Sequence, residues 1–294
     1  MRRGWTAGRS ALRIANIEAT TAQRHRPTRL ENLATDLGLL YRRYRRPHWW
    51  LREIGVIHQY RALLAKARNQ PAWTALFAPE REPLVTVHIA TYNRARVLTE
   101  RTLPTVLAQT WKNLEVLIVG DHCTDDTAQR VAALGDPRIR FINLPERGVY
   151  PSDAFARWCV AGAAPMNHAL EVLQGEWVAP LDDDDEFAPD HVEVMLNACR
   201  ANRWEWCYAI ARMQLLTGEW RDVGSLPLRR DHVCHSAVFY WSGLRFMPHD
   251  VNAWKLGEPG DWNLWRRMQQ AGVRTGFVPR LVATHHLERS QWGR

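Results

Sequence analysis

The sequence predicts an α/β fold with a mostly parallel central sheet, preceded by a basic, α-helical N-terminal extension. Apolar runs of strand length alternate with helical stretches from Leu84 onward, which is the pattern of a parallel sheet with right-handed crossovers. Polar loops follow three of these runs at the point where each run ends. The net charge of +8 is unevenly spread, because residues 1–81 carry 16 Lys and Arg but only 5 Asp and Glu. The basic charge therefore belongs to the extension.

The extension, residues 1–82, is expected to be mainly helical. Thr28 begins a capping box, and leucines from Leu30 onward recur at helical spacing as far as Pro47. A second helix is expected to follow, with Trp50 on its apolar face. We expect both helices to pack against the main domain, because apolar faces need a surface to bury against. The alternative is a basic, Trp-bearing surface for anionic lipid or a partner.

The main domain, residues 83–294, follows a linker from Pro71 to Pro83. Strands are expected at 84–90, 114–119, 138–144, 177–181, 206–214, 219–223, 237–240, 274–278 and 281–283. Helices are expected at 95–109, 124–134, 165–174, 189–201 and 258–272. Pro104 is expected to kink the first of these helices, and Thr124 to cap the second. The later strands, around the Thr217-Gly218 turn, are expected to be antiparallel.

The most informative stretch is Trp177–Phe187, in which an apolar run ends in five consecutive acids, Asp182–Glu186. Ligands of open α/β sheets bind at the carboxyl ends of the strands. Clustered carboxylates repel one another unless a cation lies among them, and oxygen ligands suit Mg²⁺ or Mn²⁺. The alternative is a solvated acidic turn that caps the helix near Pro189. Because Thr91–Arg94 and Gly120–Thr127 end two other strands at the same edge, we predict one composite site.

Composition excludes several classes of protein. The five cysteines are scattered without a CxxC pair, which argues against a disulfide framework or a zinc ribbon and favours reduced cytosolic thiols. His232–His235 (His-Val-Cys-His) could suggest zinc, but no second ligand cluster has the right spacing. No apolar run has the length of a membrane span, and the N-terminus lacks the apolar centre of a signal peptide. A cytoplasmic protein is expected, with peripheral membrane contact through the extension as an option. No nucleic-acid partner is expected, because no binding motif accompanies the charge.

The stretch from Leu84 to Leu287 resembles family 2 of the glycosyltransferases, which have the GT-A fold, a Rossmann-like sheet with a smaller antiparallel part. The segments that carry the resemblance are Thr91–Arg94 (Thr-Tyr-Asn-Arg), Gly120–Asp125 (Asp-Asp-Gly-Ser-Thr-Asp in the family), Leu181–Asp185 (Leu-Asp-x-Asp-Asp), Gly260–Leu264 (Glu-Asp or Asp-Trp-Asp-Leu in the family) and His285. Two departures stand out. Gly120 replaces the first acid of its motif, so Asp121 would contact the base alone. Met166 stands where many members have Arg before Asn167, so Arg94, Arg147 or Arg157 would contact the diphosphate instead.

The resemblance implies an inverting, metal-dependent transferase. It would move a sugar from a nucleoside diphosphate sugar, with UDP expected, to a hydroxyl of a saccharide or another acceptor. Asp121 would accept the N3–H of uracil. The implied nucleotide contacts are Thr91, Tyr92, Asn93, Arg94, Asp121, Asn167, Asp182 and Asp183. Asp182 and Asp184, facing one side of an extended segment, would hold Mn²⁺ or Mg²⁺ together with His285. Asp261 would be the catalytic base, with Trp262 and Glu258 near the acceptor and Glu258 as its nearest rival.

Each of these residues also has a structural interpretation. Asp121 and Asp261 could be helix caps, and His285 a buried, hydrogen-bonded histidine. A sugar nucleotidyltransferase shares the sheet, but it normally has a Gly-rich, Arg-containing loop after the first strand, which Thr91–Arg94 is not. A non-catalytic protein that binds nucleotide sugars or nucleic acid is the third interpretation. The Asp cluster and Asp261 argue against it.

Overall fold

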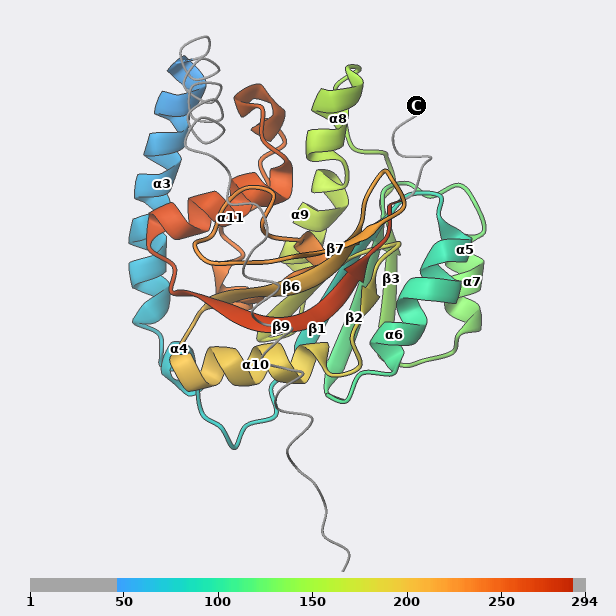
Figure 1. Ribbon diagram of the computed structural model, residues 1–294, viewed down its shortest axis with the longest axis horizontal. Helices are drawn as coiled ribbons and strands as arrows, with labels where there is room; N and C mark the ends of the chain where they lie inside the picture. The colour runs from blue at the N-terminus through green and yellow to red at the C-terminus, as the bar shows by residue number, and fades with distance from the viewer. Residues whose placement is uncertain (1–46, 288–294) are drawn as a thin grey trace, which may run out of the picture. The chain divides into compact units, whose positions relative to one another are not determined.

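The strands of the main domain form one curved, mixed sheet in the computed structural model, which describes residues 47–287 (Figure 1). The strand bounds are β1 Val85–Thr91, β2 Leu114–Gly120, β3 Ile139–Asn143, β4 Trp177–Asp182, β5 Glu186–Phe187, β6 Trp206–Gln214, β7 Trp220–Val223, β8 Val238–Trp241 and β9 Thr275–His285. Within the described residues the sheet has nine strands in the order β3-β2-β1-β4-β8-β6-β9-β5, with β7 on β6. β1 to β4 are mutually parallel, whereas β8 is antiparallel to both β4 and β6. The predicted sheet is confirmed.

The two short strands expected after residue 274 are in fact one strand, β9, which runs parallel to β6. The interruption suggested by Pro279 is a bulge: Ala209 pairs with Val278, but the next residue, Ile210, pairs with Leu281. Proline cannot donate a ladder hydrogen bond, so it is tolerated at such an irregularity. The strand therefore continues through the bulge as far as His285.

The helices of the structure differ from the predicted helices mainly in two segments, one predicted as a linker and one as a loop. Their bounds are α3 Pro47–Arg68, α4 Pro71–Ala75, α5 Ala95–Val97, α6 Leu103–Leu107, α7 Thr127–Ala133, α8 Ala154–Val160, α9 Ala163–Val172, α10 His191–Asn202 and α11 Gly260–Ala271. Short turns of π- or 3₁₀-helix are η1 Leu98–Thr102, η2 His235–Ala237, η3 Ser242–Leu244 and η4 Ala253–Leu256. The helix expected at 95–109 is interrupted by the π-turn, which lies directly before Pro104. Two elements were missed: α4 in the linker, and α8, capped by Asp153.

Helix α3 is the described part of the N-terminal extension, and it packs against the main domain; the first predicted helix lies outside the described residues. Pro47 begins α3, a position where the missing N–H costs nothing. Ile57, Tyr60 and Leu64 are buried, as expected for a packed apolar face. His48–Arg294 form one compact unit, so α3 belongs to the same body as the sheet. No helix within residues 47–287 is both long and apolar enough to span a membrane.

Tryptophan fills much of the core beneath the sheet. Trp177, Trp206 and Trp265 are all completely buried. Trp206 stacks on Trp265 with ring centroids 5.5 Å apart, and Trp177 stacks on Phe239 at 5.3 Å. These contacts assign three of the 15 tryptophans to core packing. They also hold α11 against β6, and α11 carries the predicted catalytic base at its start.

Candidate active site

The loops after β1, β2 and β4 meet at one edge of the sheet. Parallel pairing sets Thr91 beside Gly120 and Ala90 beside Asp182. Thr91 Oγ1 donates a hydrogen bond of 2.6 Å to Asp183 Oδ2, which ties the first loop to the acidic loop. The three loops that the sequence placed in one composite site are therefore neighbours in the structure.

Asn93 joins the first two loops. Its φ of 51° is in the left-handed region, where Asn is among the better-tolerated residues. Its Oδ1 accepts from the amide of Thr124 at 2.8 Å, and its Nδ2 donates to Thr124 Oγ1 at 3.1 Å. The prediction that Thr124 caps α7 is therefore wrong. Asp125 binds the first amide of that helix instead, that of Thr127.

The acidic loop, Asp182–Asp185, turns immediately after β4 and does not stay extended. The amide of Asp185 donates to the carbonyl of Asp182 at 3.2 Å, which closes a turn. The alternation argument for Asp182 and Asp184 therefore fails, because it needs an extended chain. Arg94 pairs instead with two adjacent acids, Asp183 at 3.3 Å and Asp184 at 2.8 Å.

Burial raises the pKa values of three carboxyl groups in the acidic loop, those of Asp182, Asp183 and Asp184. Burial raises the pKa of Asp182 to about 6, with Asp185 and Asp184 adding to the rise. Burial also raises the pKa of Asp183 to about 7, although Arg94 beside it acts in the opposite direction. Both pKa values are above the ordinary value of an Asp carboxyl group, so the protonated form stabilises the folded loop. This stabilisation is lost as pH rises through about 6 to 7. A bound cation would substitute for those protons.

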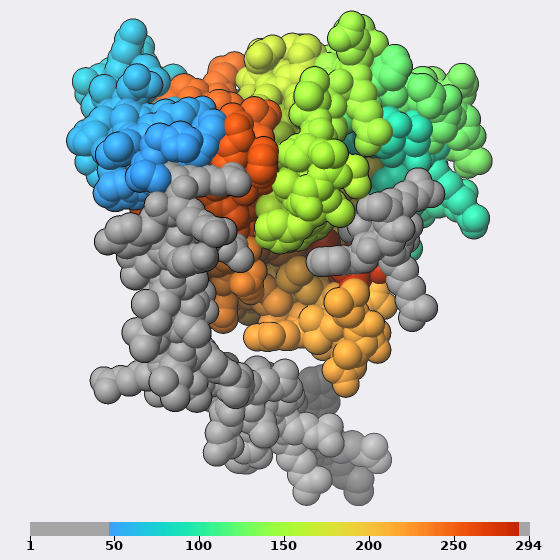
Figure 2. Space-filling model, turned by 90° about the horizontal axis from the view of Figure 1, so that it is seen from above, coloured from blue at the N-terminus to red at the C-terminus, as the bar shows by residue number. Residues whose placement is uncertain are grey.

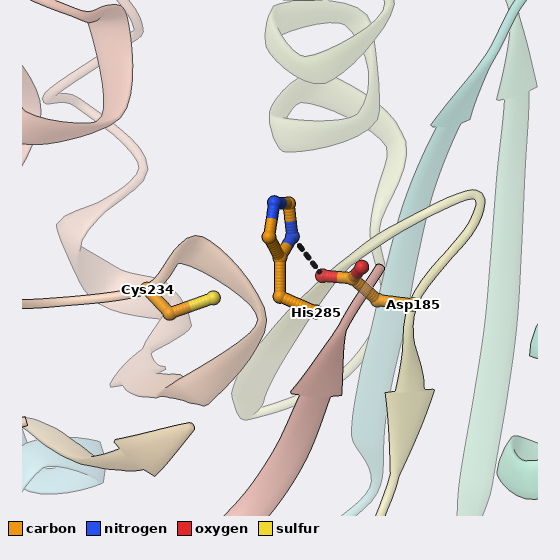
Figure 3. A group of neighbouring side chains, drawn as sticks. All are labelled: Asp185, Cys234 and His285. Atoms are coloured by element: carbon orange, nitrogen blue, oxygen red, sulfur yellow. Dashed lines mark hydrogen bonds and ion pairs between the residues drawn. The ribbon is translucent and has the colours of Figure 1, made fainter. Parts of the chain in front are cut away.

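His285, the predicted metal ligand at the end of β9, lies against Asp185 and not against Asp184. Its Nδ1 is 3.0 Å from Asp185 Oδ2 (Figure 3). Asp185 also accepts hydrogen bonds from Ser236 Oγ and from the amide of His286. Burial alone would lower the pKa of His285, but the Asp185 carboxylate raises it to about 9. Sequence reasoning did not assign Asp185 a role, although it directly follows the Asp-x-Asp pattern.

Asp121 lies on β2's polar loop and is 3% exposed. Its Oδ1 accepts from the amide of Gly148 at 2.8 Å, and its Oδ2 accepts from the hydroxyl of Tyr150 at 2.7 Å. α7 begins six residues later, at Thr127, so Asp121 is not its cap. Burial and the neighbouring Asp121 raise the pKa of the Tyr150 hydroxyl, which stays a hydrogen-bond donor.

The guanidinium carbon of Arg147 lies 3.6 Å from the ring centroid of Tyr92, in the loop after β1. Arg147 also approaches Asp121 Oδ2 at 3.9 Å. The segment from Arg147 to Tyr150 therefore covers the predicted base-binding residues. No local sequence signal predicts this contact, since it joins two loops that are distant in the chain.

Asn167, which the sequence predicts to contact the nucleotide, binds the backbone of His249 in this structure. Its Nδ2 donates to the carbonyl of His249 at 3.0 Å, and its Oδ1 accepts from the amide of the same residue at 2.8 Å. Both ends of the side-chain amide are thus engaged by one backbone unit. Asn167 anchors the chain that leads into η4 and α11.

Asp261 and Glu258, the two candidates for the base, have different surroundings. Asp261 is half-buried in the first turn of α11, where its Oδ1 accepts a hydrogen bond from the amide of its half-buried neighbour, Trp262. Glu258 is buried, 2.6 Å from Arg266 Nη2 and 2.8 Å from Asn263 Nδ2. Arg266 also binds Glu53 of α3 at 2.7 Å. Glu258 is therefore part of a buried ion-pair network, and Asp261 is the better placed of the two to meet a substrate.

Cys234 lies beside the acidic loop, where its sulfur is within 4.8 Å of an oxygen of Asp185. Burial raises the pKa of its thiol, and the carboxylates of Asp185, Asp182 and Asp261 raise it further. Figure 2 shows a hollow between the yellow-green atoms of α8 and the orange atoms of the β6–β7 region.

Comparison with known proteins identifies similar sequences and folds. The profile of glycosyl transferase family 2 matches residues 86–208. The β-1,3-glucosyltransferase WfaP of Escherichia coli, named as using UDP-Glc and α-D-GlcNAc-diphosphoundecaprenol, is 33% identical over 199 residues, which are 65% of this chain and 72% of WfaP. The putative colanic acid glycosyl transferase WcaA of E. coli K12 is 34% identical over 161 residues, 54% of this chain and 53% of WcaA. The chain thus spans about half the length of WcaA and less of several other relatives.

Two solved structures show the same fold at low sequence identity. S. aureus TarS 1–349 in complex with UDP-GlcNAc has a TM-score of 0.56 and 17% identity, over 71% of this chain and 61% of TarS 1–349. The mannosyltransferase PcManGT of Pyrobaculum calidifontis, in complex with GDP-Man and Mn²⁺, has a TM-score of 0.52 and 19% identity, over 81% of this chain and 66% of PcManGT. The expected GT-A architecture is confirmed by these neighbours.

Proposed function

This chain belongs to glycosyl transferase family 2, and we propose that it transfers a sugar from a nucleoside diphosphate sugar to an acceptor hydroxyl. The observation that carries the proposal is that three strand ends meet: Asp121, Arg94 and the acidic loop lie at one edge of the sheet. Such an edge is where open α/β sheets bind nucleotides.

The residues at this edge fit a hard divalent cation. Asp182 and Asp184 would supply oxygen ligands, and burial, together with the neighbouring carboxylates, raises the pKa values of both carboxyl groups. Mn²⁺ or Mg²⁺ held there would supply a Lewis acid that neutralises the departing diphosphate. Arg94 adds a fixed cation next to the same carboxylates and could contact the diphosphate.

For the donor, we favour UDP-sugars, and the Asp121 carboxylate would accept the N3–H of uracil. Gly148 and Tyr150 hold that carboxylate in a fixed orientation. The donor in the name of WfaP, UDP-Glc, supports the choice of base. Tyr92 and Arg147 present flat groups beside Asp121, on which a base could stack.

For the acceptor, we favour a sugar hydroxyl on a saccharide carried by a lipid diphosphate. The acceptor in the name of WfaP has this chemistry. Asp261, half-buried at the start of α11, would remove the hydroxyl proton as the new bond forms. A single carboxylate base without a nucleophilic partner supports one displacement with inversion at the anomeric carbon. Trp262, half-buried beside it, offers a ring to the acceptor sugar.

The metal assignment predicts that Asp182→Asn and Asp184→Asn fold normally but lose the Mn²⁺-dependent part of UDP binding. Each substitution removes the charge and the anionic ligand that the cation requires. Calorimetry of UDP binding with and without Mn²⁺ measures the effect. Protons compete with the cation, so the affinity of the unsubstituted protein for Mn²⁺ should fall below about pH 6, where Asp182 becomes protonated. Equal Mn²⁺-dependent binding by both variants would exclude this site.

The base assignment predicts that Asp121→Ala weakens UDP binding by about 1.5–3 kcal/mol, the usual range for a hydrogen bond to a charged group. Tyr150→Phe is the matched control, since it keeps the carboxylate and removes one group that orients it. Its effect should be smaller. If the unsubstituted protein binds GDP more tightly than UDP, the site reads another base.

Membrane contact through the N-terminal part is a further prediction. Trp50 and Leu51 at the start of α3 are 40% and 61% exposed, and Lys255 Nζ lies 4.0 Å from the Trp49 ring. Full-length protein should co-sediment with anionic vesicles at low salt and leave them at high salt. Replacing Trp50 and Leu51 together by Ser should reduce the bound fraction. Leu216→Ser, at another exposed position, should not. Equal binding to neutral vesicles would rule out the electrostatic contribution.

A further inference from the structure

Three side chains with different donor atoms converge beside the acidic loop. One oxygen of Asp185, the sulfur of Cys234 and one ring nitrogen of His285 all lie within 4.8 Å of one another (Figure 3). They come from three distant segments: the loop after β4, the residue before η2, and the end of β9. The antiparallel pairing of β5 with β9, together with the hydrogen bond from Ser236 to Asp185, brings these segments together. The cluster is therefore a product of the fold.

The chemistry of this cluster differs from that of the Asp182 and Asp184 carboxylates. Mg²⁺ and Mn²⁺ prefer oxygen ligands, whereas a thiolate selects softer cations, of which Zn²⁺ is the common one. Cysteine, histidine and aspartate are all zinc ligands, at about 2.3 Å for sulfur and about 2.0–2.2 Å for nitrogen and oxygen. In a tetrahedron these lengths set the ligand atoms roughly 3.3–3.8 Å apart. The observed spacing of up to 4.8 Å thus needs to close by about 1 Å.

We propose that Asp185, Cys234 and His285 form a second metal site, which binds Zn²⁺ or another thiophilic divalent cation. Cys234 is a free thiol. Binding displaces its proton and the proton of the His285 imidazolium to solvent, so that a thiolate, a carboxylate and a neutral imidazole face the cation. Three protein ligands leave a fourth tetrahedral position open, which is the arrangement of exchangeable zinc sites and not of closed structural ones.

The site would also regulate the proposed transfer reaction. His285 is the residue that this cluster shares with the predicted ligands of the catalytic cation. Zinc would hold His285 beside Asp185 and Cys234, and would place a second positive charge next to Asp182. We expect micromolar Zn²⁺ to inhibit transfer even when Mn²⁺ is saturating. This consequence rests on the proposed function, whereas metal binding itself does not.

Co²⁺, which has spectroscopic transitions that Zn²⁺ lacks, tests the site without reference to activity. Reduced full-length protein titrated with Co²⁺ should develop an intense near-ultraviolet thiolate-to-cobalt charge-transfer band that saturates at one equivalent, and Zn²⁺ should abolish it. Cys234→Ser should lose the band, and His285→Ala should weaken it strongly. Asp184→Asn should retain it, because Asp184 is no ligand of this site. Cys123→Ser is the thiol control: Cys123 is more exposed than Cys234, and its variant should keep the band.

Two outcomes would overturn the proposal. The first is a wild-type protein that binds Co²⁺ without a thiolate band, a result that stands even if Cys234→Ser fails to fold. The second is a folded Cys234→Ser variant with an undiminished band. A positive band in a protein that has no transferase activity would support the metal site and refute the proposed function. The two inferences are thus separable.

Discussion

Asp261→Asn should bind UDP and Mn²⁺ as the unsubstituted protein does, yet transfer sugar about 10²–10⁴ times more slowly, the usual cost of removing a general base. The amide keeps the shape of the side chain and can still accept the hydrogen bond from the amide of Trp262. It cannot take a proton. The substitution should therefore change the chemical step and leave α11 in place. Single-turnover transfer from a radiolabelled donor measures the rate, and calorimetry measures binding.

Asp126→Asn is the matched control, because Asp126 is an exposed residue at the start of α7 and should leave the rate unchanged. Glu258→Gln, which the sequence alone suggests as the comparison, is less suitable. Glu258 is buried against Arg266, so its substitution tests stability together with chemistry. Native transfer rates in Asp261→Asn would show that the base lies elsewhere and that the family motif is misaligned over this segment.

The sequence predicted the location of the site because the location follows from strand order. Parallel strands end at one edge, so Thr91, Asp121 and Asp182 had to be neighbours once their strands were recognised. The strand patterns were strong, since β1, β2 and β4 are almost entirely buried and β2 and β4 are mostly apolar. The prediction of the fold and of the composite site thus rested on the strand patterns and on the residues directly after each strand.

The sequence could not predict which side chains face one another inside the site. The turn at Asp182 to Asp185 directs Asp184 toward Arg94 and Asp185 toward His285, and residue spacing contains no information on this choice. Tyr150, from the loop before α8, reaches Asp121 across 29 positions of sequence. Such contacts are made by tertiary packing, which also overrides local propensity where α8 replaces the expected loop.

The other large effect is expected for stability. Arg266→Met should lower the free energy of unfolding by about 3–5 kcal/mol, the cost of removing one partner from a buried ion pair. Arg266 lies between Glu53 and Glu258, at 2.7 Å and 2.6 Å, and all three residues are buried. Without the guanidinium, two carboxylates would face each other away from water. Urea unfolding measures the change, and Arg212→Met, which breaks a half-exposed pair with Asp222, should cost only about 0–1 kcal/mol.

The same network connects the N-terminal part of the chain to the proposed catalytic base. Glu53 lies on α3, Arg266 on α11, and α11 begins beside Asp261. A chain shortened by residues 1–82 would lose Glu53 and should be destabilised, although every predicted site residue is retained. Combining Glu53→Gln with Arg266→Met should recover part of the loss, because one stranded carboxylate is removed. If Arg266→Met costs less than about 1 kcal/mol, or if the double variant is additive, the three charges do not act as one buried unit.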